Sequence, residues 1–156
     1  MPLLPLEPWA GTASRPGRQA VLDAEGRVVD DLARGRVPAT LEQLRFEAYR
    51  LAAVSWEDRW AYGRVARAEE LIAEAHRQGS RWSEAWLAWR SSWWIRETLR
   101  SPGAAERHRV MGLLHARVGR YDDAARRLAQ AVESAGDAHA AGIRPLLQLL
   151  SVVDGR

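Results

Sequence analysis

The sequence predicts an all-α protein in which six or seven helices pack as antiparallel hairpins. Apolar residues recur at helical spacing along most of the 156-residue chain, and glycine or proline separates these segments at short intervals. One pair of segments also repeats at an offset of 39 residues. This length corresponds to about one domain, so we expect an N-terminal arm over residues 1–20 and a single helical domain over residues 21–156.

Composition excludes several classes of protein. Hydrophobic residues make up 47% of the chain and charged residues 28%, which is typical of a globular domain rather than a disordered one. The absence of cysteine excludes disulfides, thiolate nucleophiles and cysteine zinc sites. There is no apolar run long enough to cross a membrane and no signal-peptide pattern at the start, so we expect a cytoplasmic protein without membrane contact.

The N-terminal segment through Gly17 is rich in proline and glycine, which favours an extended arm. Residues 21–32 follow, with apolar positions on one helical face. The alternative for this segment is a hairpin that turns on residues 23–26, where Gly26 would supply a positive φ. Gly35 and Pro38 end the element in either case.

Two start signals come next. Thr40, with Gln43 three residues later, has the spacing of a capping box and predicts a helix that continues to about residue 52. Ser55 and Asp58 repeat this spacing less strictly, and they precede a helical run over residues 56–77 that Gly79 and Ser80 stop.

The remaining segments predict four more helices, over residues 82–99, 104–118, 122–134 and 137–153. Short glycine- or proline-containing turns separate them. Pro145 falls inside the last helix and would bend it or move its start to about residue 144. We therefore divide the domain into N-terminal helices (21–62), two repeated helix pairs (63–135) and a C-terminal capping helix (137–153).

The offset of 39 residues aligns residues 70–76 with residues 109–115 and Arg81-Trp82 with Arg120-Tyr121. The second unit is marked by a set of small and aromatic residues: Gly112, Gly119, Tyr121, Ala124, Leu128 and Ala131. The first unit matches it at Ala73, Trp82, Ala85, Trp89 and Ser92, with Ser80 in place of the glycine.

With these residues, the chain resembles the tetratricopeptide repeat (TPR) family over about residues 67–133. The period departs from that of the family, because 39 residues exceed the usual number of about 34. The surplus is expected in the connection around residues 100–105. A generic helical bundle rich in alanine is the alternative.

The resemblance implies stacked helix pairs whose first helices form a groove for a partner segment. Carried over residue by residue, the groove positions are Arg67, Glu70, Glu74, Arg77, Gln78, Glu106, Arg109, Leu113, Ala116 and Arg117. Four of them are arginines, which bind carboxylates bidentately, so we expect a peptide or protein partner with an acidic segment or chain terminus. The alternative is that these arginines pair with acids of the same helix, as Arg67 with Glu70.

The sequence contains eight tryptophans, and Trp82, Trp86, Trp89 and Trp93 share one helical face. We favour core packing for this face, with the indole N–H groups near acceptors at the rim. It is alternatively a stacking surface for nucleic acid, together with Arg81, Arg90 and Arg96, or a surface for a partner or homodimer. Because packing within the repeat explains Trp82 and Trp89, we assign Trp86 and Trp93 to partner binding.

No catalytic or metal-binding motif occurs, so we expect neither an enzyme nor a cofactor or metal, although an enzyme of unrecognised type is a second alternative. His76 and His115 occupy equivalent repeat positions, for which we favour packing. All 23 basic residues are arginines, but 20 acids accompany them and the net charge is only +3. Nucleic-acid binding is therefore a weaker hypothesis than a protein-interaction module.

Overall fold

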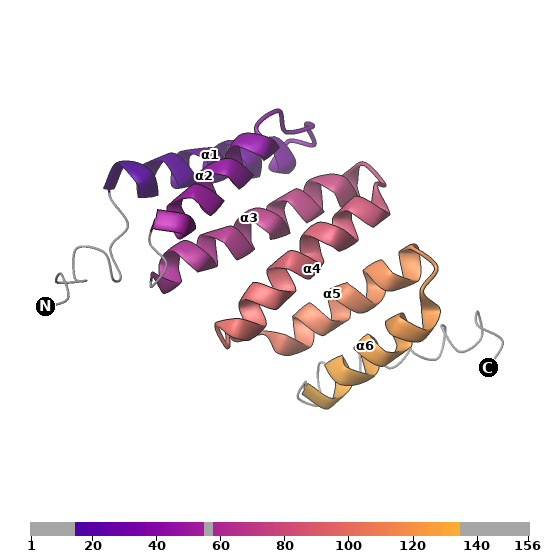
Figure 1. The fold of residues 1–156 in the computed structure, drawn as a ribbon. Coiled ribbons are helices and arrows are strands. Elements are labelled where there is room, and N and C mark those ends of the chain that lie inside the picture. Colours follow the sequence, from indigo (N-terminus) through magenta and orange to yellow (C-terminus); the bar gives the residue numbers. More distant parts are fainter. Residues whose placement is uncertain (1–14, 55–57, 135–156) are drawn as a thin grey trace, which may run out of the picture.

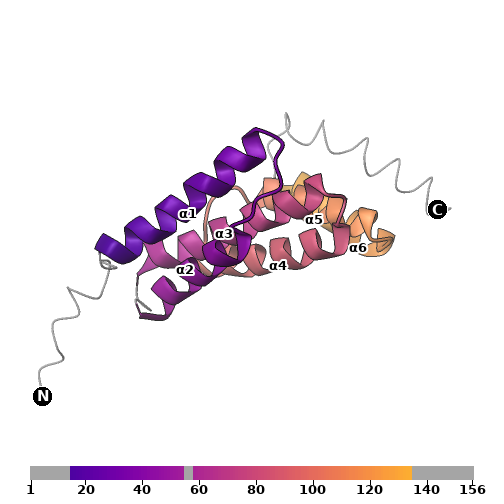
Figure 2. The same cartoon turned by 90° about the horizontal axis from the view of Figure 1, so that it is seen from above.

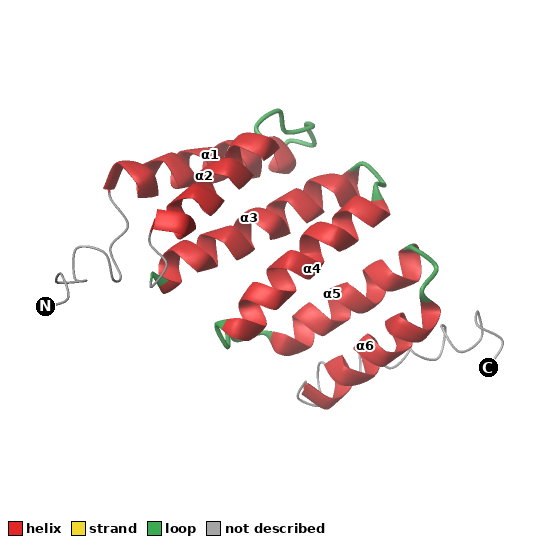
Figure 3. Ribbon diagram, viewed as in Figure 1, coloured by secondary structure: helices red, strands yellow, loops and turns green. Residues whose placement is uncertain are grey.

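The computed structural model describes residues 15–54 and 58–134, which contain α-helices joined by turns and no strand. The helices are α1 (Arg15–Ala33), α2 (Leu41–Val54), α3 (Arg59–Gln78), α4 (Trp82–Thr98), α5 (Ala104–Arg117) and α6 (Tyr121–Ser134). They follow one another across the molecule in chain order (Figures 1 and 3). The all-α class is therefore confirmed, and the hairpin alternative for residues 21–32 is wrong because α1 contains them. None of the described helices is both long and apolar enough to span a membrane.

The predicted arm extended too far into the chain. Residues 15–20 belong to the first turns of α1 although they include Pro16 and Gly17. Proline is compatible with a first turn, because the amide it lacks has no partner inside the helix at that position. Residues 1–14 of the arm, Pro145 and the predicted helix over residues 137–153 lie outside the described residues.

The starts of α2 and α3 differ in detail from the capping predictions. Helix α2 begins after Thr40 as expected, with the Leu44 amide donating to the Thr40 carbonyl over 2.9 Å, but the Thr40 hydroxyl is buried without a partner. Helix α3 starts at Arg59, and the Asp58 carboxylate caps it by accepting from the Trp60 amide at 2.9 Å. The expected start at residue 56 was wrong, and Ser55 lies outside the described residues.

The repeat seen in the sequence is also a repeat of structure. Helices α3 and α5 end at Gln78 and Arg117, and α4 and α6 begin at Trp82 and Tyr121, each pair being 39 residues apart. Figures 1 and 2 show that the two hairpins, α3–α4 and α5–α6, follow the same antiparallel path. The connection between the two hairpins runs from the end of α4 at Thr98 to the start of α5 at Ala104, in the region where the surplus length was expected.

Gly112 allows the two helices of the second hairpin to approach closely. A Cβ atom at this position would lie 2.8 Å from Leu128 Cγ and 3.2 Å from the Ala124 carbonyl oxygen. Both distances are too short for a side chain without moving α6. Gly112 therefore allows α5 to pack directly against Ala124 and Leu128 of α6.

The largest apolar core lies among α1, α2 and α3 and includes Val21, Leu44, Leu51, Val65 and Leu71. Between α3 and α6 the fully buried positions are mostly small, as Ala85, Ala88 and Ala124 show. These small residues let the helix backbones approach closely where they touch. Beside these contacts, space remains between the helices. The tryptophan rings of α4 project into that space, where two cavities form.

Candidate functional site

A groove of about 420 Å³ lies between α3, α4 and α5. We call it the α3–α5 groove, and its lining residues are Glu70, Ala73, Glu74, Arg77, Trp82, Trp89, Arg109, Val110, Leu113, Leu114 and Arg117. Ala73 of α3 and Leu114 of α5 are buried at its base, and Leu113 is half-buried beside them. Trp82 and Trp89 form the wall on the α4 side, so the groove combines an apolar interior with a charged edge.

Two of the arginines at the groove edge are paired within their own helices. Arg77 donates from Nε to a Glu74 carboxylate oxygen at 2.7 Å, and Arg109 donates likewise to Glu106 at 2.8 Å. The bond from Arg77 holds the pKa of Glu74 below its usual value. The alternative of pairing within one helix is thus confirmed for these two arginines, whose charges are largely compensated.

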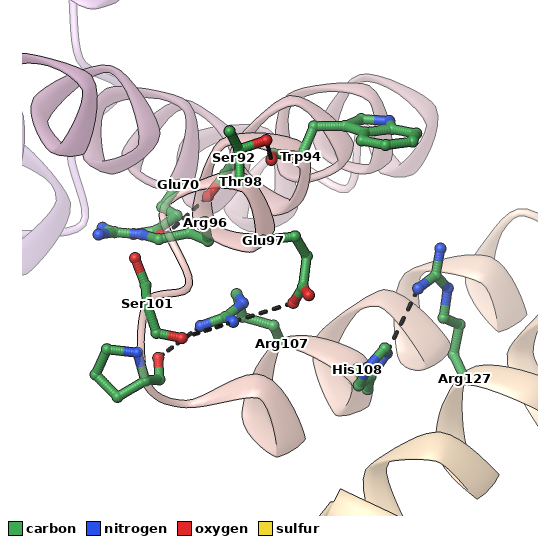
Figure 4. Close-up of polar contacts among 11 residues, drawn as sticks. Glu70, Ser92, Trp94, Arg96, Glu97, Thr98, Ser101, Arg107, His108 and Arg127 are labelled. Atoms are coloured by element: carbon green, nitrogen blue, oxygen red, sulfur yellow. Dashed lines mark hydrogen bonds and ion pairs between the residues drawn. The ribbon is translucent and has the colours of Figure 1, made fainter. Parts of the chain in front are cut away.

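The particular pair expected between Arg67 and Glu70 does not form. The Glu70 carboxylate instead accepts from Arg96 Nε at 3.0 Å and from the Ser92 hydroxyl at 2.9 Å, both on α4 (Figure 4). This contact crosses from the first to the second helix of the hairpin. Arg96 is therefore engaged with Glu70 and is not a member of a stacking surface on the tryptophan face.

The predicted partner-binding residues separate into three groups. Glu70, Glu74, Arg77, Arg109, Leu113 and Arg117 line the α3–α5 groove. Arg67 and Gln78 are exposed on α3 and line neither cavity. Trp86 and Trp93 lie in a second cavity, because α5 divides the tryptophan face of α4.

The second cavity, of about 510 Å³, lies between α4, α5 and α6. We call it the tryptophan–arginine cavity, and its lining residues are Trp86, Arg90, Trp93, Trp94, His108, Met111, His115, Arg120, Asp123, Arg126, Arg127 and Gln130. It shares no lining residue with the α3–α5 groove. The two hollows use different faces of α5, so they can be altered independently.

The prediction of core packing holds for Trp89, which packs against the buried residues Ile72, Ala73 and Ala88, but no tryptophan of α4 is fully buried. Trp86, Trp89 and Trp93 are half-buried, and Trp94 is 61% exposed. The indole N–H groups of Trp86, Trp89 and Trp93 are shut off from solvent but have no acceptor, so the expected rim acceptors are missing as well. A buried donor without an acceptor costs about 1–3 kcal/mol of folding free energy. Each of these N–H groups would therefore gain from a hydrogen bond to a ligand.

The arginines of the tryptophan–arginine cavity outnumber its acids. Arg120 and Arg126 share the Asp123 carboxylate at 2.8 and 2.5 Å. Arg127 lies over the Trp93 ring at 4.3 Å, with Nη1 3.4 Å from His108 Nδ1 (Figure 4). Burial lowers the pKa of Arg127, as expected of a cation held partly out of water.

Arg90 of α4 completes the set of cations, with its guanidinium 4.8 Å from the centre of the Trp86 ring. Arg81, which was grouped with it as a stacking residue, instead donates to His76 Nδ1 at 2.9 Å. Only Arg90 among the three predicted stacking arginines therefore lies beside the tryptophans in this cavity.

The two repeat histidines have different surroundings. His115 is 5% exposed, packs against the Trp86 ring at 5.5 Å and has no hydrogen-bond partner at Nδ1. Burial lowers its pKa, and burial also lowers the pKa of His76. Over residues 15–54 and 58–134, no group of three or more histidine, aspartate or glutamate side chains is placed to hold a metal ion.

Sequence reasoning missed most of the second cavity because, apart from Arg90 of α4, its arginines lie just before α6 or within it. A signal was present: Arg120, Asp123, Arg127 and Gln130 are spaced three or four residues apart and so share one face of that helix. What the spacing did not indicate is that this face lies opposite Trp86 and Trp93. That opposition depends on how α6 packs on α5.

Comparison with known proteins identified no relative of this chain. The functional inference therefore depends on the geometry of the α3–α5 groove and the tryptophan–arginine cavity. No protein-family model, no curated protein and no solved structure matches this chain.

Proposed function

We propose that this chain is a TPR-like interaction module, without catalytic activity, that binds a peptide segment of a partner protein in the α3–α5 groove. The observation that carries the proposal is the groove itself, an apolar interior edged by charge and built from corresponding helices of two repeated hairpins. The structural repeat and the close approach at Gly112 support the resemblance to the TPR family.

The lining of the groove favours a particular kind of segment. Ala73, Leu113 and Leu114 offer an apolar surface for one aliphatic or aromatic side chain of the partner. Arg117 lies over the Trp82 ring at 4.8 Å and forms no ion pair among the residues that the structure describes. A carboxylate near the apolar side chain would therefore meet Arg117 rather than the compensated Arg77 and Arg109.

A nucleic-acid function has less support. Of the arginines that were grouped with the tryptophans, Arg81 is engaged with His76 and Arg96 with Glu70. A continuous positive track along α4, which single-stranded nucleic acid requires, is therefore missing from the described helix.

The test is a selection of random peptides on the full chain, followed by titration of the selected peptides. We expect them to share an apolar residue close to an acidic one. Leu113→Glu should weaken their binding at least tenfold, because it places a charge in the apolar groove. The matched control is Leu87→Glu, since Leu87 is 46% exposed on α4 and lines neither cavity.

Both variants should retain the wild-type helical circular dichroism. The proposal is wrong if no peptide is enriched, if the enriched peptides lack this pattern, or if Leu87→Glu weakens binding as much as Leu113→Glu.

A further inference from the structure

The tryptophan–arginine cavity plays no part in the peptide groove, and its chemistry points to a different ligand. We propose that it binds a small aromatic phosphate ester of the mononucleotide class. The inference is independent of the proposed peptide binding because the two sites share no lining residue.

The first argument is charge. Arg90, Arg120, Arg126 and Arg127 line the cavity, and among the described lining residues Asp123 is the one carboxylate. Asp123 compensates part of the charge of Arg120 and Arg126, which it binds at 2.8 and 2.5 Å. Even with both histidines neutral, three positive charges remain in excess, so the cavity favours a dianion such as a phosphate monoester over a monocarboxylate.

The second argument is that two of the arginines are held over tryptophan rings rather than by acids. Arg90 lies over Trp86, and Arg127 lies over Trp93. A contact between a cation and a ring is weaker than a pair of charge-assisted hydrogen bonds to phosphate oxygens. An entering phosphate can therefore draw both guanidinium groups away from the rings at a small cost.

The third argument is a set of buried ring nitrogens without hydrogen-bond partners. Trp86 Nε1, Trp93 Nε1 and the ring of His115 at Nδ1 are buried beside the cavity without hydrogen-bond partners. His115 is itself 5% exposed, so it is a polar side chain that the fold buries with one ring nitrogen, Nδ1, left without a partner. Small rotations of these rings, once the arginines have moved, would bring their nitrogen atoms within reach of ligand atoms.

The fourth argument concerns the aromatic part of the ligand. Trp94 is 61% exposed, and its ring meets Trp93 edge to face, with 5.1 Å between ring centres. One face of a large ring is therefore open beside the cluster of cations, and a base can stack on it. A volume of about 510 Å³ is within the range of small-molecule sites and favours a single nucleotide over a polymer.

The experiment is isothermal titration calorimetry of the full chain with adenosine and uridine 5′-monophosphates. Adenosine, inorganic phosphate and a ten-residue oligothymidylate are the comparison probes. We expect at least one monophosphate to bind at least tenfold more tightly than either adenosine or inorganic phosphate, because only the ester engages both the arginines and the ring.

Substitution locates the site. Arg127→Gln should weaken monophosphate binding about 10- to 100-fold, as expected when charge-assisted hydrogen bonds are lost. Arg90→Gln is the second variant, because Arg90 is exposed and its replacement leaves the buried residues in place. The matched control is Arg50→Gln on α2, since Arg50 pairs with Glu47 at 2.8 Å and lines neither cavity.

Four outcomes would overturn the inference: no monophosphate binds at millimolar concentration, inorganic phosphate binds as tightly as the esters, the oligothymidylate binds more tightly than any monophosphate, or Arg50→Gln weakens binding as much as Arg127→Gln. Peptide binding by Arg127→Gln should equal that of the wild type. Failure at this cavity is thereby distinguished from failure at the α3–α5 groove.

Discussion

Glu69 shows how one buried charge joins two helices at the residue scale. Its side chain lies in α3 and is 2% exposed. Its carboxylate accepts from Arg45 at 2.9 and 3.1 Å and from the Tyr49 hydroxyl at 3.1 Å, both donors being on α2. Burial together with the charge of Glu69 raises the pKa of Tyr49 to about 12, so the phenol keeps its proton well into the alkaline range.

We expect Arg45→Met to lower the free energy of unfolding by about 3 kcal/mol, because it leaves a buried carboxylate without a cation. The double variant Arg45→Met with Glu69→Met should recover most of this loss, since it removes both charges. Urea denaturation followed by circular dichroism measures both.

The control for this pair is Arg50→Met, which breaks the exposed pair with Glu47 and should cost about 0.5 kcal/mol or less. If the double variant is as unstable as Arg45→Met alone, the buried charge is not the cause of the loss.

At the scale of the secondary-structure element, the same hydrogen-bonded turn follows the C-terminal ends of α3 and α5. The Arg81 amide donates to the His76 carbonyl at 2.8 Å, and the Arg120 amide donates to the His115 carbonyl at 2.8 Å. The turn requires a left-handed residue just before the arginine, which is Ser80 with φ +57° in one turn and Gly119 with φ +83° in the other. Ser80 therefore occupies a conformation that favours glycine.

We expect Ser80→Gly to raise the free energy of unfolding by about 0.5–1 kcal/mol, because it removes the left-handed strain and the exposed serine side chain makes little packing contact. Gly119→Ala should lower it by about 1 kcal/mol at the equivalent position. A Cβ at Gly119 would have no atom within 4 Å, so the effect there is one of backbone conformation alone. Thermal unfolding of both variants checks the pair, and a fall in stability on Ser80→Gly would contradict it.

Arg107 determines the path of the longer connection between the two hairpins. Its side chain is 7% exposed and donates to the carbonyl oxygens of Pro102 at 2.6 Å and Ser101 at 3.0 Å (Figure 4). It also donates to Glu97 at 3.1 Å. One buried arginine thus satisfies the backbone of the turn between α4 and α5, and in doing so it fixes where α5 begins relative to the tryptophans.

At the scale of the whole molecule, α5 separates two hollows of different chemistry. Its face bearing Leu113 and Arg117 lines the apolar α3–α5 groove, whereas its face bearing His108 and His115 lines the cationic cavity. Successive residues of a helix point in different directions, so opposite faces of α5 carry different side chains. The helix therefore lines both hollows, and none of its side chains lines both.

The histidines make the stability of the whole molecule dependent on pH. Burial lowers the pKa of His76, His108 and His115 in the folded chain, so the folded state prefers neutral imidazoles. Around His115, Asp123 opposes this effect, and Arg120, Arg126 and Arg127 reinforce it. The unfolded chain then binds more protons once the pH falls below about 6.5, and stability decreases in that direction.

We expect the urea midpoint to fall between pH 7.5 and pH 5.5, a range above the ordinary titration of carboxylates. His115→Gln should reduce the fall, because it removes a buried group that protonates in the unfolded state. A midpoint that rises toward pH 5.5, or an unchanged slope in His115→Gln, would contradict this origin.

Much of the fold could be predicted from the sequence because helix boundaries depend on local residues. Apolar spacing and the breakers Gly35, Pro38, Gly79 and Gly119 placed the helices within a few residues, and the offset of 39 identified the repeated hairpins. Most of the groove positions that the resemblance to the TPR family implied on α3 and α5 also line the α3–α5 groove, although Arg67 and Gln78 do not. The predicted start of α3 was too early because Asp58, rather than an earlier residue, caps it.

The sequence by itself therefore determined the all-α class, the hairpins and the abundance of arginine and tryptophan. Only the tertiary structure decided which side of α5 each tryptophan faces. It also decided that Arg96 of α4 binds Glu70 of α3, and that Arg126 and Arg127 of α6 lie with Arg90 of α4 in the second cavity. Helical periodicity is a property of neighbouring residues along one chain segment. Ion pairs and cavities depend on the angles and distances between helices, and these are set by small residues such as Gly112 at a few points of close contact.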